Sequence, residues 1–163
     1  MNPYTRIFSA LNKARIRYLV VGGVAMNLLG YSRFTGDIDV LLALDQENLR
    51  KMAALMQKLD YEKRQPISID ELGDEKKVLK LMKEKHLTAF TFSPLKGPPF
   101  NIDIIVGESL QFEKYAKSAV SIRAAKLTIP VISIDDLIGM KKKSPREKDA
   151  LDVAILLEFR HEG

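Results

Sequence analysis

Residues 19–42 read LVVGGVAMNLLGYSRFTGDIDVLL, and this stretch decides how the rest of the chain folds. An apolar run over Tyr18–Val21, rich in residues that favour β-structure, stops at Gly22-Gly23. Helical spacing follows from Val24 to Leu29, and Gly30 stands where the first residue after a helix is often a glycine. The stretch therefore predicts a buried strand, a glycine turn and a short helix.

A second strand is expected to begin near Asp37. Side chains alternate across a strand, so Asp37 and Asp39 share one face while Ile38, Val40 and Leu42 take the other. Two carboxylates roughly 7 Å apart on one strand face repel each other, and strands disfavour Asp. A hard divalent cation with oxygen ligands would relieve that repulsion, and paired ions of this kind serve phosphoryl transfer.

The two glycines fit the same chemistry. A backbone without Cβ atoms can come close to a phosphate, and the helix that follows presents unpaired N–H groups toward it. The stretch thus predicts a divalent-metal site beside a phosphate-binding turn.

This combination resembles the signature of the nucleotidyltransferase superfamily that includes DNA polymerase beta. In that signature a Gly-Gly or Gly-Ser pair precedes an Asp-x-Asp or Asp-x-Glu strand, and here thirteen residues separate Gly22-Gly23 from Asp37-Ile-Asp39-Val. With Arg33 and Thr35 ahead of the aspartates, the chain looks like the minimal bacterial members grouped with abortive-infection toxins and antibiotic nucleotidyltransferases. The resemblance is strong over residues 18–42 and looser over 100–106 and 131–157.

The resemblance implies an α/β fold, with a small mixed β-sheet flanked by helices and C-terminal helices packed on one side. We expect one nucleotidyltransferase-like domain over residues 1–163, with a catalytic core at about 17–107 and a helical part at about 133–160. It also implies a metal-dependent enzyme in which Asp37 and Asp39 bind Mg²⁺ or Mn²⁺ and Gly22 and Gly23 cradle the β and γ phosphates of a nucleoside triphosphate.

A third carboxylate is expected on a neighbouring strand. The run Phe100–Val106 is rich in β-formers, and alternation puts Asp103 on the face opposite its isoleucine neighbours at 102 and 104. The resemblance implies a third carboxylate on a neighbouring strand, and on that basis Asp103 is assigned as a metal ligand and as the base toward the acceptor hydroxyl. The plain alternative is a surface aspartate on an edge strand, or one whose hydrogen bonds are made by the backbone. Asp70 and Asp74 compete for the role, but both lie in a polar segment.

Four further residues are candidates for nucleotide binding. Arg33 could hold a triphosphate oxygen in a bidentate contact, with Thr35 beside it, or these residues could decorate a loop. Lys143 and Lys148 lie in a C-terminal pattern that resembles the same minimal transferases, in which a basic residue faces the nucleotide. The alternative is a helix start with i, i+4 salt bridges such as Lys148 to Asp152.

Periodicity and capping residues predict the other elements. Expected helices run from Pro3 to Ile16, from a cap at Asp45 to Leu59, from about Asp74 to Lys85, over Gln111 to Ala119, over Ile134 to Lys142 with Ser133 as cap, and from Ser144-Pro145 onward. Expected strands cover Tyr61 to Gln65 at an edge, Leu87 to Ser93 in a hairpin with Phe100 to Val106, and Ser121 to Ile132, where Pro130 breaks one or two short strands. The apolar stripe of the last helix is assigned to Ala150, Leu151, Ala154, Ile155 and Leu157. Lys141 and Lys142 are interpreted as solvated residues that complement a helix dipole.

Composition narrows the class of protein. The chain has 163 residues, 46% of them hydrophobic and 29% charged, as in an ordinary globular protein, and its net charge of +5 suits anionic ligands such as nucleoside triphosphates or RNA. It has no Cys and only two His, which excludes disulfides, thiolate zinc and a His-rich metal site. Neither an apolar run of membrane-spanning length nor a signal-peptide core is seen, so we expect a cytoplasmic protein.

The predicted function is transfer of a nucleoside monophosphate from a nucleoside triphosphate to a hydroxyl acceptor, with release of pyrophosphate. An RNA or tRNA end, a protein and a small molecule all remain open as acceptors, because fold does not determine function. CCA-adding enzymes are disfavoured, since Met26 and Asn27 stand where those enzymes carry an Arg-Asp pair. The rival from another class is a catalytically idle binding module, such as an antitoxin or an RNA-binding partner.

Overall fold

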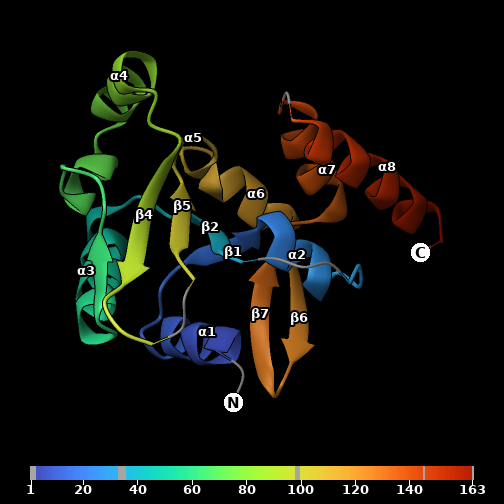
Figure 1. Cartoon of the computed structure of the whole chain (residues 1–163), viewed down its shortest axis with the longest axis horizontal. Helices are drawn as coiled ribbons and strands as arrows, with labels where there is room; N and C mark the ends of the chain where they lie inside the picture. Colours follow the sequence, from blue (N-terminus) through green and yellow to red (C-terminus); the bar gives the residue numbers. More distant parts are fainter. Residues whose placement is uncertain (1–2, 33–35, 98–99, 145, 163) are drawn as a thin grey trace.

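The computed structural model describes residues 3–32, 36–97, 100–144 and 146–162. Within them seven strands form one mixed sheet (Figure 1). In order across the sheet they are β3 (Tyr61–Lys63), β4 (Ala89–Pro94), β5 (Ile102–Ile105), β2 (Ile38–Leu42), β1 (Tyr18–Val21), β7 (Leu127–Val131) and β6 (Val120–Ala124). The pairs β2–β5 and β1–β7 are parallel, and the other neighbours are antiparallel. The predicted α/β fold with a mixed sheet is confirmed.

Helices flank this sheet. They are α1 (Pro3–Lys13), α2 (Gly22–Leu28), α3 (Gln46–Lys58), a 3₁₀ helix (Ile69–Gly73), α4 (Glu75–Lys85), α5 (Val106–Ser109), α6 (Phe112–Ser118), α7 (Ile134–Lys142) and α8 (Glu147–Glu162). The caps predicted for α3 and α7 are confirmed, because Asp45 accepts a hydrogen bond from the Asn48 amide and Ser133 accepts one from the Asp136 amide. Both bonds satisfy N–H groups that the first turn of a helix leaves unpaired.

The two faces of the central strands differ in chemistry. In β5 the buried residues Ile102 and Ile104 alternate with the half-buried Asp103 and Ile105, as predicted. Side chains at alternate positions point to opposite faces, so one face of β2, β5 and β4 belongs to the hydrophobic core and the other carries the polar residues. In Figure 1, β3 and β4 lie at one end of the sheet and the α7–α8 pair lies at the other.

Three predicted boundaries need correction. Helix α2 begins at Gly22 itself, so the glycines form its first turn and do not precede it. Pro130 does not break a strand: it pairs with Ser121 inside β7, close to the end of that strand, where the pairing with β1 is made at Val131. The last helix begins at Glu147, and Pro145 lies outside the described residues.

The apolar stripe predicted for α8 is also wrong. Leu151 is 63% exposed, whereas Asp149, Asp152 and Leu156 are buried. The inward face of this helix therefore includes two acidic side chains, which a hydrophobic pattern assigns to solvent. No helix in the described part of the chain is long and apolar enough to cross a membrane.

Candidate active site

The turn from β1 into α2 lies against Asp39. Gly22 has a φ of +68°, a conformation that side chains with a Cβ atom rarely adopt, and a Cβ atom there would overlap the Asp39 carboxylate. The register agrees, since Val21 pairs with Asp39 across the antiparallel β1–β2 ladder. The two parts of the sequence signature, which are separated along the chain, are thus in contact in the fold.

The predicted carboxylates come from two adjacent strands. Asp39 of β2 pairs with Asp103 of β5 in the parallel ladder, so their side chains share a face of the sheet. Thr91 of β4, which pairs with Asp103, donates a hydrogen bond from its hydroxyl to Asp103 Oδ1 at 2.6 Å. Just before β2, Asp37 Oδ1 accepts a hydrogen bond at 2.8 Å from the backbone N–H of Asn101. Asp37 and Asp103 are therefore each held by a hydrogen bond from a neighbouring segment.

Burial and mutual repulsion disfavour the charged forms of two of these acids. Burial, followed by the charges of Asp103 and Asp37, raises the pKa of Asp39 to about 7. Burial also raises the pKa of Asp103, with the charge of Asp37 adding to the shift and the hydrogen bond from Thr91 opposing it. A carboxylate whose pKa is raised by its acidic neighbours is typical of a site that receives a cation or a proton.

The donor set fits Mg²⁺ or Mn²⁺ in part. In the described part of the chain, no group of three or more His, Cys, Asp or Glu side chains is already arranged to hold a metal ion. Asp39 and Asp103 are nevertheless in hydrogen-bond contact, with Asp37 close enough for its charge to act on both. Magnesium ordinarily takes only one or two protein carboxylates and completes its shell with water and substrate phosphates. The three aspartates therefore suit an ion that arrives with a triphosphate.

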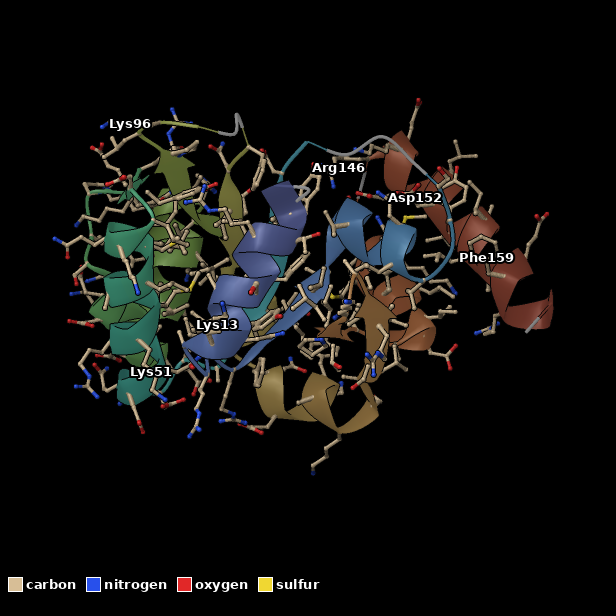
Figure 2. All side chains as sticks on the ribbon, turned by 90° about the horizontal axis from the view of Figure 1, so that it is seen from below. Lys13, Lys51, Lys96, Arg146, Asp152 and Phe159 are labelled. Atoms are coloured by element: carbon tan, nitrogen blue, oxygen red, sulfur yellow. The ribbon has the colours of Figure 1, made fainter. Side chains whose placement is uncertain are left out.

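Lys141 is the residue that sequence reasoning misjudged. Its place in the last turn of α7 agrees with the dipole interpretation, but its side chain is only 10% exposed and is not solvated. The ammonium group lies 2.9 Å from Asp152 Oδ2 and 3.3 Å from Asp149 Oδ1, and Arg146 binds the other oxygen of Asp149 at 2.8 Å. We call these four residues the α7–α8 ion cluster; Figure 2 labels Arg146 and Asp152 in it.

This cluster lies close to the carboxylates. The positive charge of Lys141 acts on Asp39 and opposes the rise of its pKa. The signal that could have identified Lys141 is the Asp149-x-x-Asp152 spacing, which puts two acids on one face of a helix and requires a cation from the element packed against it.

The remaining predicted nucleotide-binding residues differ in what can be said of them. Gly23 lies in the first turn of α2, next to Gly22. Lys143 and Lys148 are exposed, one after the end of α7 and the other in the first turn of α8. Arg33 and Thr35 lie outside the described residues. The assignment of these side chains to nucleotide binding stays a prediction.

Solved structures share this fold at low sequence identity. The lincomycin-bound lincosamide antibiotic adenylyltransferase LnuA has a TM-score of 0.62 at 13% identity, over 96% of this chain and 95% of that chain. An antigenic nucleotidyltransferase-like protein from Paracoccidioides brasiliensis has a TM-score of 0.60 at 15% identity, over 95% of this chain and 72% of that chain. ANT(2″)-Ia in complex with adenylyl-2″-tobramycin has a TM-score of 0.54 at 16% identity, over 98% and 95%.

The sequence comparison identifies the family. Among curated proteins no match was found. The family model described as nucleotidyl transferase AbiEii toxin, type IV TA system, matches residues 6–163, which is nearly the whole chain. That span includes the glycine turn, all three aspartates and the α7–α8 ion cluster. The chain is therefore a nucleotidyltransferase and belongs to the AbiEii family.

Proposed function

We propose that this protein transfers a nucleoside monophosphate from a nucleoside triphosphate to the hydroxyl group of an acceptor, in a reaction that requires Mg²⁺ or Mn²⁺ and releases pyrophosphate. One observation carries the proposal: Asp39 faces Asp103 across a parallel ladder while Gly22 lies against the Asp39 carboxylate. A phosphate-binding turn and an acidic pair are thereby adjacent, as transfer of a phosphoryl-type group requires.

The three aspartates have distinct proposed roles. Asp37, Asp39 and Asp103 would hold the metal, which when bound supplies positive charge to the triphosphate and makes the acceptor hydroxyl easier to deprotonate. Asp103, oriented by Thr91, takes the proton of the acceptor hydroxyl while the oxygen of that hydroxyl forms a bond to the α-phosphorus. The bond from this phosphorus to the β-phosphate oxygen breaks, and pyrophosphate leaves with the bonding electrons.

The backbone and the basic side chains stabilise the triphosphate. Val21, the residue before α2, makes no side-chain cap, so the N–H groups of Gly22 and Gly23 belong to a first turn without such a partner. These groups would bind the β and γ phosphates. Lys141, whose charge acts on Asp39, would offset negative charge that develops during transfer. Arg33, Thr35, Lys143 and Lys148 remain candidates for further phosphate contacts.

The acceptor is an RNA or tRNA end, a protein or a small molecule. The description of the family supports the further proposal that the transfer acts as the toxic activity of a type IV toxin–antitoxin system, and we expect it in the cytoplasm. Incubation of a cell lysate with the protein and each radiolabelled nucleoside triphosphate would identify the acceptor by the class of molecule that becomes labelled.

A thermal-shift titration tests the proposal directly. Because lone carboxylates bind magnesium weakly, a nucleoside triphosphate together with Mg²⁺ or Mn²⁺ should raise the melting temperature, and the metal alone should not. Pyrophosphate release from each of the four nucleoside triphosphates then gives the preferred nucleotide. If none of the four nucleotides, added together with metal, raises the melting temperature of the wild-type protein, the metal-dependent mechanism is wrong.

A further inference from the structure

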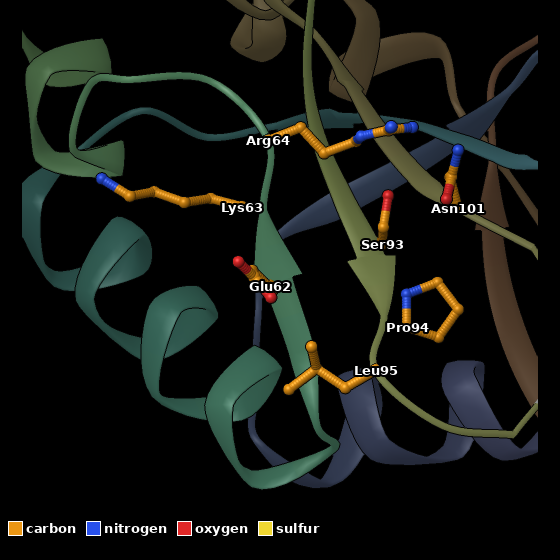
Figure 3. Close-up of a pocket in the computed structure, with 7 residues that line it drawn as sticks. All are labelled: Glu62, Lys63, Arg64, Ser93, Pro94, Leu95 and Asn101. Atoms are coloured by element: carbon orange, nitrogen blue, oxygen red, sulfur yellow. The ribbon is translucent and has the colours of Figure 1, made fainter.

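A pocket of about 550 Å³ lies beside the carboxylates, at the β3–β4 end of the sheet (Figure 3). The residues of its lining that concern us are Glu62, Arg64, Ser93, Leu95 and Asn101. They come from β3 and the residue after it, from the end of β4 and the residue after it, and from the residue before β5. Part of the pocket is therefore formed by β4, which carries Thr91, and by the residue that leads into β5, which carries Asp103.

Strand register makes the floor of this pocket continuous with the candidate active site. Ser93 is two residues beyond Thr91 on β4, and Asn101 is two residues before Asp103, so each shares the face of its neighbour. The backbone N–H of Asn101 also donates a hydrogen bond to Asp37 Oδ1 at 2.8 Å. A molecule with one end at Asp103 could thus place its other end in the pocket without crossing a strand.

One hydroxyl in this pocket lacks a partner. Ser93 Oγ is buried and forms no hydrogen bond. Among the described residues it is the one buried side-chain nitrogen or oxygen atom without a hydrogen-bond partner. A buried polar atom without a partner costs free energy, and such atoms are rare in native structures. A polar group of a ligand could therefore gain a hydrogen bond with Ser93 once the atoms that cover its Oγ move aside.

Arg64 supplies the positive charge of the pocket. In Figure 3 its side chain extends above Ser93 toward Asn101, whereas Lys63 extends the other way and donates a hydrogen bond to the Ile67 carbonyl at 2.9 Å. The Arg64 charge also reaches Asp103 and opposes the rise of its pKa. A guanidinium group matches phosphate and carboxylate in geometry, because it can bind two of their oxygens at once.

We propose that this pocket binds the acceptor, and that the acceptor carries a phosphate or a similarly compact anion near its reacting hydroxyl. Arg64 binds the anion, while Ser93 and Asn101 bind neighbouring hydroxyl groups. A polycationic acceptor fits poorly, since Arg64 repels it and Glu62 is the one carboxylate in the lining. The inference rests on the proposed function, because it assigns the pocket to the second substrate of the same reaction.

The test is a pair of NMR titrations of the whole protein with ribose 5-phosphate and with ribose, without nucleotide or metal. We expect the amide signals of Ser93, Leu95 and Asn101 to shift, and ribose 5-phosphate to bind about tenfold more tightly or better, the value of a hydrogen-bonded ion contact. Arg64→Gln should remove this preference, and Ser93→Ala should lower the affinity for both sugars. Arg123→Gln, an exposed cation on β6 at the other edge of the sheet, is the control and should keep the preference.

Three outcomes would overturn the inference: equal affinity for the two sugars, shifts confined to the Gly22–Gly23 turn, or a phosphate preference that survives Arg64→Gln. A dinucleoside monophosphate in place of ribose 5-phosphate distinguishes a phosphate within a nucleic acid chain from that of a free sugar phosphate.

Thermal shift with nucleoside triphosphate and Mg²⁺ separates this inference from the proposed function. Arg64→Gln should leave that shift unchanged, because the triphosphate lies at the Gly22–Gly23 turn. If the wild type shows the shift but no phosphate preference in the pocket, only the acceptor assignment fails. If the wild type shows no shift, the proposed function fails, whatever the sugars do.

Discussion

Two clusters of buried charge lie close together in this protein, and they are balanced differently. The α7–α8 ion cluster supplies its own counter-charges: Lys141 lies between Asp149 and Asp152, and Arg146 completes the set. Among the aspartates of β2 and β5, Lys141 acts on Asp39 and Arg64 acts on Asp103, but burial and the acidic neighbours outweigh Lys141, and the pKa of Asp39 rises to about 7. The balanced cluster fits a structural role, whereas the unbalanced one suits a site that receives a cation or a proton.

Asp39→Asn should have the largest effect on function. It removes a proposed metal ligand, so nucleotidyl transfer should become undetectable, while the metal-free protein should be as stable as the wild type or more so because repulsion with Asp103 is relieved. Labelled-nucleotide transfer and thermal unfolding measure the two halves of the prediction. The exposed Asp70→Ala is the control and should keep normal activity. A variant with near wild-type transfer would remove Asp39 from the metal site.

Asp103→Ala distinguishes the base from the other ligands. Loss of a general base typically costs about 10²–10⁴-fold in rate. Nucleoside triphosphate should still bind with metal, because Asp37 and Asp39 remain. Single-turnover transfer and a nucleotide thermal shift would show this division. Loss of binding in parallel with the rate would instead mean that Asp103 is mainly a ligand of the nucleotide-bound metal.

Lys141→Met tests the balanced cluster. It leaves the carboxylates of Asp149 and Asp152 buried with less compensation, which typically costs roughly 3–5 kcal/mol of unfolding free energy. Chemical denaturation gives the value, and Lys142→Met, an exposed neighbour in the same helix turn, is the matched control. Equal stability of the two variants would show that Lys141 is not needed to neutralise the acids.

Two glycine substitutions separate backbone strain from close approach. Gly22 and Gly97 both have positive φ, but only a Cβ atom at Gly22 meets another group, the Asp39 carboxylate. An L-residue in this conformation costs roughly 1–2 kcal/mol, so Gly97→Ala should lose about that much stability. Gly22→Ala should lose more and should also lose activity, because Asp39 must move. Similar stability and unchanged transfer in both variants would contradict the contact.

The two clusters should also differ in the pH dependence of stability, where their contributions have opposite signs. The pKa of Asp39 is raised in the metal-free fold, so its contribution to stability is complete below its unfolded value of about 4 and is lost as pH rises through about 7. Burial acts to raise the pKa of Asp149, but hydrogen bonds from Ser144 and Arg146 and the charge of Lys141 lower it overall. Its contribution is present above about pH 4 and is lost as pH falls further.

Stability curves of metal-free protein between pH 4 and pH 8 would isolate the first effect. The wild type should lose stability over this window relative to Asp39→Asn, which has no carboxyl group to titrate. Parallel curves for the two proteins would show that the Asp39 pKa is not raised.

Local rules explain which parts of the site could be predicted. The alternation of Asp39 with Ile38 and Val40 and the glycine turn depend on residues close in the chain, where strand periodicity and backbone freedom act directly. The prediction that Asp103 lies beside Asp39 needed the family resemblance as well, because the order of strands in a sheet is a tertiary property. Whether these residues perform the proposed chemistry stays a prediction.

Long-range compensation explains what could not be predicted. The apolar stripe of α8 was misplaced because Asp149 and Asp152 face inward, and their burial is tolerated only through a lysine on another helix. The unpartnered hydroxyl of Ser93 likewise depends on the arrangement of three strands, and nothing in the local sequence of β4 indicates it.

The β2–β5 pairing also determines when the active site can exist. The hydrogen bond from Asn101 to Asp37 closes a loop of 64 residues, and a closure of that length contributes no stability until both ends have formed. At ribosomal speeds of about 5–20 residues per second, a nascent chain carries Asp39 for about 3–13 s before Asp103 is added. During that interval the acidic pair is incomplete, so a nascent chain cannot carry out the proposed transfer before Asp103 has been added.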